Sequence, residues 1–248
     1  FKLIRWFMSH FKFYSAELYY SEHYYNENQL VDFYSYQEFL ESIAVPSQNI
    51  ADIDYFMSWY KANYKHKFSA HSIYEEFKGV LTGAMTDQAY LSEQGYLALG
   101  VKQSIFHVDE RAEVYAIFKH YLQDLEKQNL ADLNILSYDY LSKVKPSYDF
   151  VVIDEVQDIT AIQLYLILNS LSQKGLFLMC GDANQIVHPN FFSWAKVKSL
   201  FHRHEELHHG AEITHILQHN YRNAQRITEI SNRVLLLKNS RFGSIDKE

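Results

Sequence analysis

The stretch Tyr148–Gln163, YDFVVIDEVQDITAIQ, decides the fold class of this chain. Its run Phe150–Ile153 (FVVI) is short and rich in β-branched residues, which predicts a buried strand. Thr160–Ser172 has helical spacing, and a polar turn, Asp154–Asp158 (DEVQD), separates it from the strand. A strand that leads through an acidic turn into a helix is typical of α/β proteins.

The same alternation continues toward the end of the chain. Leu176–Cys180 (LFLMC) predicts a second buried strand, and Ile213–Leu217 is a candidate third. Helices are predicted over Ser193–His202 and over Asn223–Lys238, the latter with its first residue as N-cap. Such alternation predicts a parallel sheet with helical crossovers, in which ligands bind beyond the carboxyl ends of the strands.

The earlier part of the chain has a different period. Its clearest helix is Asp109–Lys127, whose apolar residues recur every three or four positions behind an acidic first turn. Further helices are predicted over Tyr36–Ile43, Asp52–Tyr64 and Ser69–Leu81, the last with Gly83 as C-cap. The first part is therefore expected to be mostly α-helical.

Charge and tyrosine divide the chain in the same way. Residues 1–150 carry 13 Lys+Arg against 20 Asp+Glu, and residues 151–248 carry 10 against 10, which together account for the net charge of −7. Eighteen of the 20 tyrosines lie in the first part. We predict a mostly helical subdomain over 1–147, with an acidic, Tyr-rich surface as a candidate site for a protein partner, and an α/β domain over 148–248. The acidity argues against a histone-like coat on DNA but permits a groove with a few cations and aromatic rings.

Composition excludes several classes of protein. With 48% hydrophobic residues and only eight Gly and three Pro in 248 residues, the chain is not disordered or low in complexity. A single cysteine, Cys180, excludes a disulfide scaffold and fits a reducing intracellular compartment, the cytoplasm or nucleoid. No apolar run approaches the roughly 18 residues of a membrane span. Because the chain begins with Phe1, we expect a piece of a longer protein.

Three polar motifs follow the predicted strands. The adjacent acids Asp154 and Glu155 suit a hydrated magnesium ion and a water-activating base, although acids also decorate ordinary helix starts. Gln185, in the segment GDANQ, could hydrogen-bond a γ-phosphate or its attacking water, or could belong to an ordinary loop. Arg222, in HNYR at the start of a helix, could reach phosphate oxygens or could be structural.

Taken together and in this order, the motifs resemble those of the UvrD/Rep group of superfamily 1 helicases, whose motifs II, III and IV read like VIDEVQD, GDxxQ and NYR. The matching stretches here are YDFVVIDEVQDITAIQ, GDANQI and LQHNYRNAQRITEISNRVLLLK. Within the group, the chain looks most like the helicase-like core of large tetratricopeptide- and ankyrin-repeat proteins and their bacterial relatives. That likeness rests on SIYEEFKGVLTG, YLALGVKQS, VKSLFHR and RFGSIDKE.

The resemblance implies an ATP-driven motor that acts on single-stranded or partly duplex DNA, with ATP and Mg²⁺ as cofactors. It also implies that the α/β part is the later portion of a RecA-like motor domain. Carried over by position, Asp154 is the magnesium ligand, Glu155 the catalytic base and Gln185 the γ-phosphate sensor. Arg222 contacts phosphate, and Tyr221 lies against adenine.

Aromatic residues just after the third motif stack on DNA bases in this group, which makes Phe191, Phe192 and Trp194 candidates for DNA binding. The two phenylalanines could equally belong to the core. The segment Val187–Phe191 departs from the tyrosine-aromatic-arginine-glycine pattern of the group. The details of DNA contact therefore stay open at this stage.

A phosphate-binding loop is absent from these 248 residues. The loop requires Gly-x4-Gly-Lys-Ser/Thr, and Gly95 and Gly100 alone have the glycine spacing, with Val101 where the lysine belongs. The resemblance places that loop ahead of a helical insertion, and further arginine motifs in a second motor domain. We expect these residues alone to show little or no ATPase activity.

Three classes of function remain. The intact acid pair, Gln185 and Arg222 favour a helicase or translocase ATPase. The acidic, Tyr-rich first part favours a catalytically inactive module that binds nucleic acid or protein. A metal-dependent nuclease is the weakest, because a second cluster of acids and lysine is missing.

Overall fold

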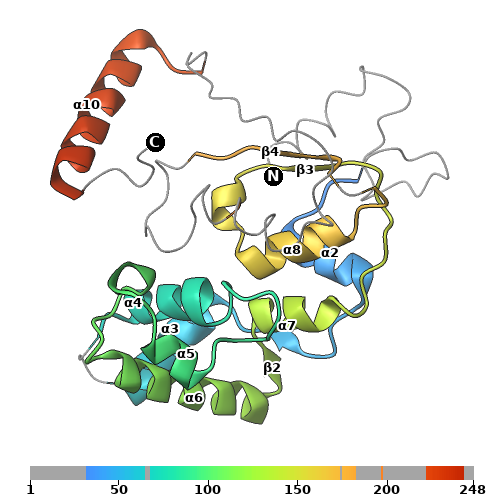
Figure 1. Ribbon diagram of the computed structural model, residues 1–248, viewed down its shortest axis with the longest axis vertical. Helices are drawn as coiled ribbons and strands as arrows, with labels where there is room; N and C mark the ends of the chain where they lie inside the picture. The colour runs from blue at the N-terminus through green and yellow to red at the C-terminus, as the bar shows by residue number, and fades with distance from the viewer. Residues whose placement is uncertain (1–31, 65–67, 174, 183–196, 198–221, 243–248) are drawn as a thin grey trace. The chain divides into compact units, whose positions relative to one another are not determined.

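The computed structural model describes residues 32–64, 68–173, 175–182, 197 and 222–242 (Figure 1). Helices dominate, and the strands come in two short pairs. The α-helices are α2 (Tyr36–Ile43), α3 (Ile53–Asn63), α4 (Ala70–Glu76), α5 (Glu93–Leu97), α6 (Arg111–Gln128), α7 (Leu133–Tyr140), α8 (Ala161–Asn169) and α10 (Gln225–Phe242). The π-helix η1 covers Phe77–Leu81, and the 3₁₀ turns η2 and η3 cover Val101–Gln103 and Val156–Asp158. The strands are β1 (Asn49–Ile50), β2 (Leu130–Ala131), β3 (Val151–Ile153) and β4 (Phe177–Met179).

By packing, the chain divides into two compact units, Phe1–Ser47 and Gln48–Glu248. In the first, helix α2 begins with a capping box: the Ser35 hydroxyl accepts from the Glu38 amide, and the Glu38 carboxylate accepts from the Ser35 amide at 2.6 Å. The helix matches the predicted range. The boundary between 147 and 148 stays a prediction.

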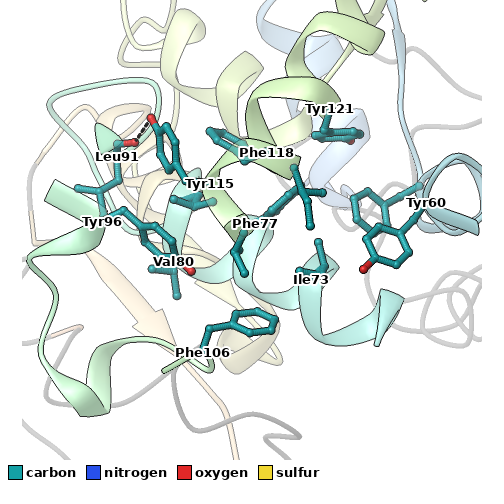
Figure 2. Close-up of a cluster of buried hydrophobic side chains, with 14 of the residues drawn as sticks. Tyr60, Ile73, Phe77, Val80, Leu91, Tyr96, Phe106, Tyr115, Phe118 and Tyr121 are labelled. Carbon is teal, nitrogen blue, oxygen red and sulfur yellow. Dashed lines mark hydrogen bonds between the residues drawn. The ribbon is translucent and has the colours of Figure 1, made fainter. Parts of the chain in front are cut away.

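The main hydrophobic core of the second unit is built from aromatic rings on α3, η1 and α6 (Figure 2). Phe56, Phe77 and Phe118 are almost fully buried and meet edge to face, with ring centroids 5.0–5.6 Å apart. Such geometry suits the ring quadrupoles and adds to the gain from burial. Many of the aromatic residues between positions 55 and 121 therefore pack in this core.

Two buried charged side chains, Glu76 and Arg111, form hydrogen bonds with the segment 96–106, which packs against this core. The Glu76 carboxylate accepts from the Tyr96 hydroxyl at 2.8 Å, the Ile105 amide at 3.0 Å and the Ser104 hydroxyl. Arg111 donates to the carbonyls of Leu99, Gly100 and Phe106. Neither side chain has exposed surface, and these hydrogen bonds make the burial of the two charged groups tolerable.

The segment from Gly95 to Gly100 has the glycine spacing of a phosphate-binding loop, but it does not have the structure of one. Gly95 lies inside helix α5, and Tyr96 is fully buried in the core. Gly100 is the cap residue directly before the 3₁₀ turn η2. A phosphate-binding loop runs from a strand through open backbone amides into a helix, so this helical segment cannot serve as one.

A short parallel pair of strands, which the sequence analysis did not predict, joins the chain before α3 to the chain after α6. Strand β1 precedes α3 and pairs with β2, which follows α6, in the register Asn49↔Leu130 and Ile50↔Ala131. Helix α6 ends at Asn129, whose left-handed conformation (φ 54°) turns the chain into β2. The local sequence holds only two residues on each side, too few for a strand signal.

The second parallel pair is the predicted strand–helix–strand unit. Strands β3 and β4 pair in the register Val151↔Phe177 to Ile153↔Met179, with α8 as the crossover (Figure 1). Ile153, Leu164 and Leu168 form a smaller hydrophobic cluster on one face. The prediction that both strands are buried is wrong for the other face, where Val152 is 61% and Leu178 51% exposed, because α8 covers one side only. This unit confirms an α/β arrangement with parallel strands, and the larger RecA-like sheet stays a prediction.

Helices α7 and α8 pack together across a buried amide. Asn134 donates through Nδ2 to the Lys78 carbonyl at 2.9 Å and the Thr82 hydroxyl at 3.0 Å. Its Oδ1 accepts from the Thr160 hydroxyl and the Gln163 amide, both at 2.9 Å. This one side chain therefore joins the helical region to the start of the helix that follows the acidic turn.

The other predicted helices that lie within the described residues are confirmed, with shifts of up to four residues at their ends. The helix predicted over Ser69–Leu81 comprises α4 and the π-helical turn η1, and Thr82, rather than Gly83, is its cap. Helix α10 begins at Gln225, two residues after the predicted cap, and its Ile230 and Val234 are exposed. The predicted elements Ser193–His202 and Ile213–Leu217 lie outside the described residues, apart from Val197, which is helical and buried.

Candidate functional site

The acidic turn begins where β3 ends, and its backbone is held by the end of β4. The Cys180 amide donates to the Ile153 carbonyl at 2.8 Å, and the Cys180 carbonyl accepts from the Val156 amide at 2.9 Å. Between these two bonds the chain places Asp154 and Glu155, both exposed. The paired strand tips therefore present the two acids at the carboxyl edge of the sheet, where α/β proteins bind ligands.

Glu155 has an unusual backbone conformation. Its φ of 52° and ψ of 44° lie in the left-handed region, which residues with a side chain adopt at a cost. Its amide donates to Asp154 Oδ1 at 3.0 Å, and its carbonyl accepts from the Asp158 amide at 2.9 Å. These bonds compensate for the strain and turn the chain sharply into η3.

Gln157 lies behind the acids, with 4% of its surface exposed. Its Nε2 donates to Glu155 Oε2 at 2.5 Å, and its Oε1 accepts from the Asp182 amide at 3.1 Å. Gly181 packs directly against the side-chain amide of Gln157. The turn after β3 and the turn after β4 thus form one connected arrangement around a buried glutamine.

The remaining predicted site residues are only partly described. Arg222 is exposed, three residues before α10 begins. The other five predicted site residues lie outside the described residues: Gln185, Phe191, Phe192, Trp194 and Tyr221. Asp154 and Glu155 are therefore the predicted residues that the described structure brings together.

The donor chemistry of the turn fits a magnesium ion. Mg²⁺ prefers oxygen ligands and is held by one or two carboxylates together with substrate phosphates and water. Asp154 offers an exposed carboxylate at a strand tip, which is a ligand of this kind. Within the described ranges, no three His, Cys, Asp or Glu side chains converge as an all-protein metal cage.

The sequence analysis did not assign roles to Gln157, Asn134 or Asp182. Gln157 stood inside a matched motif, but nothing in its spacing showed that its amide contacts the next strand. Thr160 and Gln163 carried a readable signal, since Thr-x-x-Gln is the pattern of a capping box, and the Thr160 amide donates to Gln163 Oε1 at 3.2 Å. Asn134 carried no local signal, because its partners come from distant segments.

A parallel strand–helix–strand unit with adjacent acids at the strand tip is typical of nucleotide-hydrolysing α/β domains. The profile of the UvrD/REP helicase N-terminal domain family matches residues 23–207. Because this match covers most of the chain, the chain belongs to that family. The resemblance inferred from the three motifs is confirmed.

Individual relatives agree with this membership. A probable DNA helicase II homolog of Mycoplasma capricolum is 27% identical over 138 residues, covering 53% of this chain and 18% of the relative. Human TPR and ankyrin repeat-containing protein 1 is 28% identical over 141 residues, covering 52% of this chain and 5% of the relative. The ATP-dependent DNA helicase Rep of Buchnera aphidicola is 29% identical over 150 residues, covering 53% of this chain and 22% of the relative.

These matches span less than a quarter of each of the three relatives. No solved structure gives a significant match to the chain. In the described part of the chain, no helix combines the length and the apolar character that crossing a membrane requires. Nothing among the comparisons supports the predicted protein partner of the acidic, Tyr-rich part, which stays a prediction.

Proposed function

We propose that these residues form part of an ATP-dependent DNA helicase or translocase and contribute the groups that activate water for ATP hydrolysis. The observation that carries the proposal is the exposed pair Asp154 and Glu155 at the tip of β3. Family membership supports this reading of the pair, as do relatives that are named as ATP-dependent DNA helicases.

Each residue has a distinct role in the proposal. Asp154 holds Mg²⁺, which neutralises phosphate charge when it is bound with ATP. Glu155 is the general base: its carboxylate orients the attacking water and accepts its proton. Gln185 senses the γ-phosphate and Arg222 contacts phosphate oxygens, while Tyr221 lies against adenine.

Single-stranded or partly duplex DNA is the proposed substrate, with Phe191, Phe192 and Trp194 as stacking residues. Stacking suits a translocase, because every base offers a π-face and sequence does not matter. Residues 1–150 carry 13 Lys+Arg against 20 Asp+Glu, which makes this part a poor candidate for the main DNA track. Such a substrate implies an intracellular location, in the cytoplasm or at the nucleoid.

The test uses the natural protein that contains these 248 residues. Glu155→Gln keeps the shape of the side chain but removes the base, so ATP turnover should fall by about 10²- to 10⁴-fold while ATP binding stays near the wild-type value. Glu93→Gln is the matched control, because Glu93 is an exposed glutamate paired with Lys119 on a helix surface. It should hydrolyse ATP normally.

Normal ATP hydrolysis by Glu155→Gln would show that the base is wrongly assigned. Absence of DNA-stimulated ATPase from the wild-type protein would favour the inactive helicase-like module instead. Residues 1–248 alone, which lack Gly-x4-Gly-Lys-Ser/Thr, should show little or no turnover in the same assay.

A further inference from the structure

Gln157 is buried between the two turns of the candidate site, and both the nitrogen and the oxygen of its side-chain amide form hydrogen bonds. One end meets the Glu155 carboxylate and the other meets the backbone of Asp182, which follows β4. A buried amide loses its water on both sides, so each of these bonds matters more than a surface bond would.

The orientation of the amide follows from its partners. A backbone N–H only donates, so the Asp182 amide requires the Gln157 oxygen. An ionised carboxylate only accepts, so Glu155 requires the Gln157 nitrogen. Reversing the amide would break both bonds at once, which leaves a single orientation.

Gly181 shows that the second turn is shaped around this side chain. A Cβ atom at position 181 would lie 2.6 Å from Gln157 Oε1 and 2.8 Å from Val156 Cγ1. Both distances are too short for carbon, so a larger residue would displace the amide or the turn. The close approach of backbone to amide is therefore built into the sequence as a glycine.

The Glu155 backbone is fixed by hydrogen bonds, but its side chain has three rotatable bonds and is exposed. A carboxylate that acts as a base must hold one direction, because a shift of about 1 Å can cost about 100-fold in rate. The bond from Gln157 Nε2 supplies that direction from inside the protein.

We propose that Gln157 is a positioning residue that holds the Glu155 carboxylate and couples its direction to the position of the Gly181–Asp182 turn. This inference rests on the proposed function of Glu155 as the base. Gln157 does not touch substrate in this scheme. A movement of the turn after β4 would pass through the amide to the carboxylate of the turn after β3.

The test compares two buried glutamines in the natural full-length protein. Gln157→Met keeps the length of the side chain and removes both of its hydrogen bonds. Gln163→Met is the matched control, because Gln163 is 3% exposed and also makes two bonds, to Thr160 and Asn134, but does not contact Glu155.

Gln157→Met should lower kcat for ATP hydrolysis by about 10- to 100-fold and leave KM for ATP within about twofold. Gln163→Met should lower thermal stability comparably and leave kcat within about twofold of wild type. If Gln157→Met does not fold, Gln157→Asn replaces it with the same expectation, because the shorter amide cannot reach both partners.

Equal loss of kcat in the two variants would reduce Gln157 to a structural role and overturn the inference. So would a wild-type kcat in Gln157→Met, or a loss confined to KM. Glu155→Gln, measured alongside, separates the two claims. If it is inactive while Gln157→Met is normal, only the positioning role fails, and if it is active, the proposed function itself fails.

Discussion

The region of helices α3 to α6 and the strand–helix–strand unit β3–α8–β4 differ in how completely their apolar side chains are buried. In the region of helices α3 to α6, aromatic rings form a buried core, and even Glu76 and Arg111 are buried with hydrogen-bond partners. In the strand unit, one face of β3 and β4 packs on α8, while Val152 and Leu178 remain exposed on the other. The acids Asp154 and Glu155 therefore lie on the less enclosed of the two elements.

The largest expected effect is the difference in stability between a substitution in the helical core and one on the exposed face of the strands. Phe118→Ala should lower the free energy of unfolding by about 3–5 kcal/mol, because it empties a fully buried position against Phe77 and Tyr115. Leu178→Ala, on the exposed face, should cost less than about 1 kcal/mol. Urea unfolding of the purified protein measures both, and a Leu178 effect as large as that of Phe118 would mean that the face is covered in solution.

A smaller loss of stability is expected at Asn134, whose hydrogen bonds link the two regions. Asn134→Ala should cost about 2–4 kcal/mol, because it leaves the Thr160 hydroxyl, the Gln163 amide and the Lys78 carbonyl without their partner. Asn63→Ala is the control, since Asn63 is exposed and donates to the Trp59 carbonyl at the end of α3. It should cost about 1 kcal/mol or less.

Urea unfolding again measures the pair. Equal costs for Asn134→Ala and Asn63→Ala would show that the two regions are not linked through this amide. A broad or two-step transition in Asn134→Ala alone would sharpen the comparison, because it would mean that the strand unit unfolds separately once the link is removed.

The smallest effect concerns pH. Burial raises the pKa of Tyr55 to about 12, with help from its hydrogen bond to Asp124, and burial also raises the pKa of Tyr74 to about 12. The neutral phenol is thus favoured in the folded state, so stability is complete below about pH 10 and is lost as the pH rises from there through 12.

Urea unfolding between pH 8 and pH 12, followed with the absorbance of tyrosinate, measures this dependence. Tyr55→Phe should retain more stability than wild type as the pH rises through this window. An identical loss in both proteins would show that Tyr55 does not contribute. Because these tyrosines belong to the helical region, the alkaline transition should report on that region.

Much of the secondary structure could be predicted from local patterns. The helix over 36–43 has the predicted bounds, and those over 52–64 and 109–127 differ by one or two residues, because apolar spacing and caps act locally. Helix α7 was missed, although Asp132 caps it by accepting from the Asn134 and Ile135 amides. Its apolar stripe is too weak to stand out, since Asn134 and Ser137 occupy buried positions.

The exposed face of β3 and β4 illustrates a second limit. A run such as FVVI indicates burial on both sides, but the burial of each face depends on which elements lie over it. Residue spacing carries information about period and not about neighbours. The same limit applies to Asn134, whose four partners are spread over residues 78–163.

The family, the order of strand, acidic turn and helix, and the place of Asp154 and Glu155 after the strand could be predicted from the sequence, because each depends on residues that are close together in the chain. The tertiary structure alone decided how those acids are held. The contact between Gln157 and the turn after β4 joins residues 25 positions apart. Such a contact exists only once parallel pairing has brought two strand tips to one edge, and no local pattern encodes that distance.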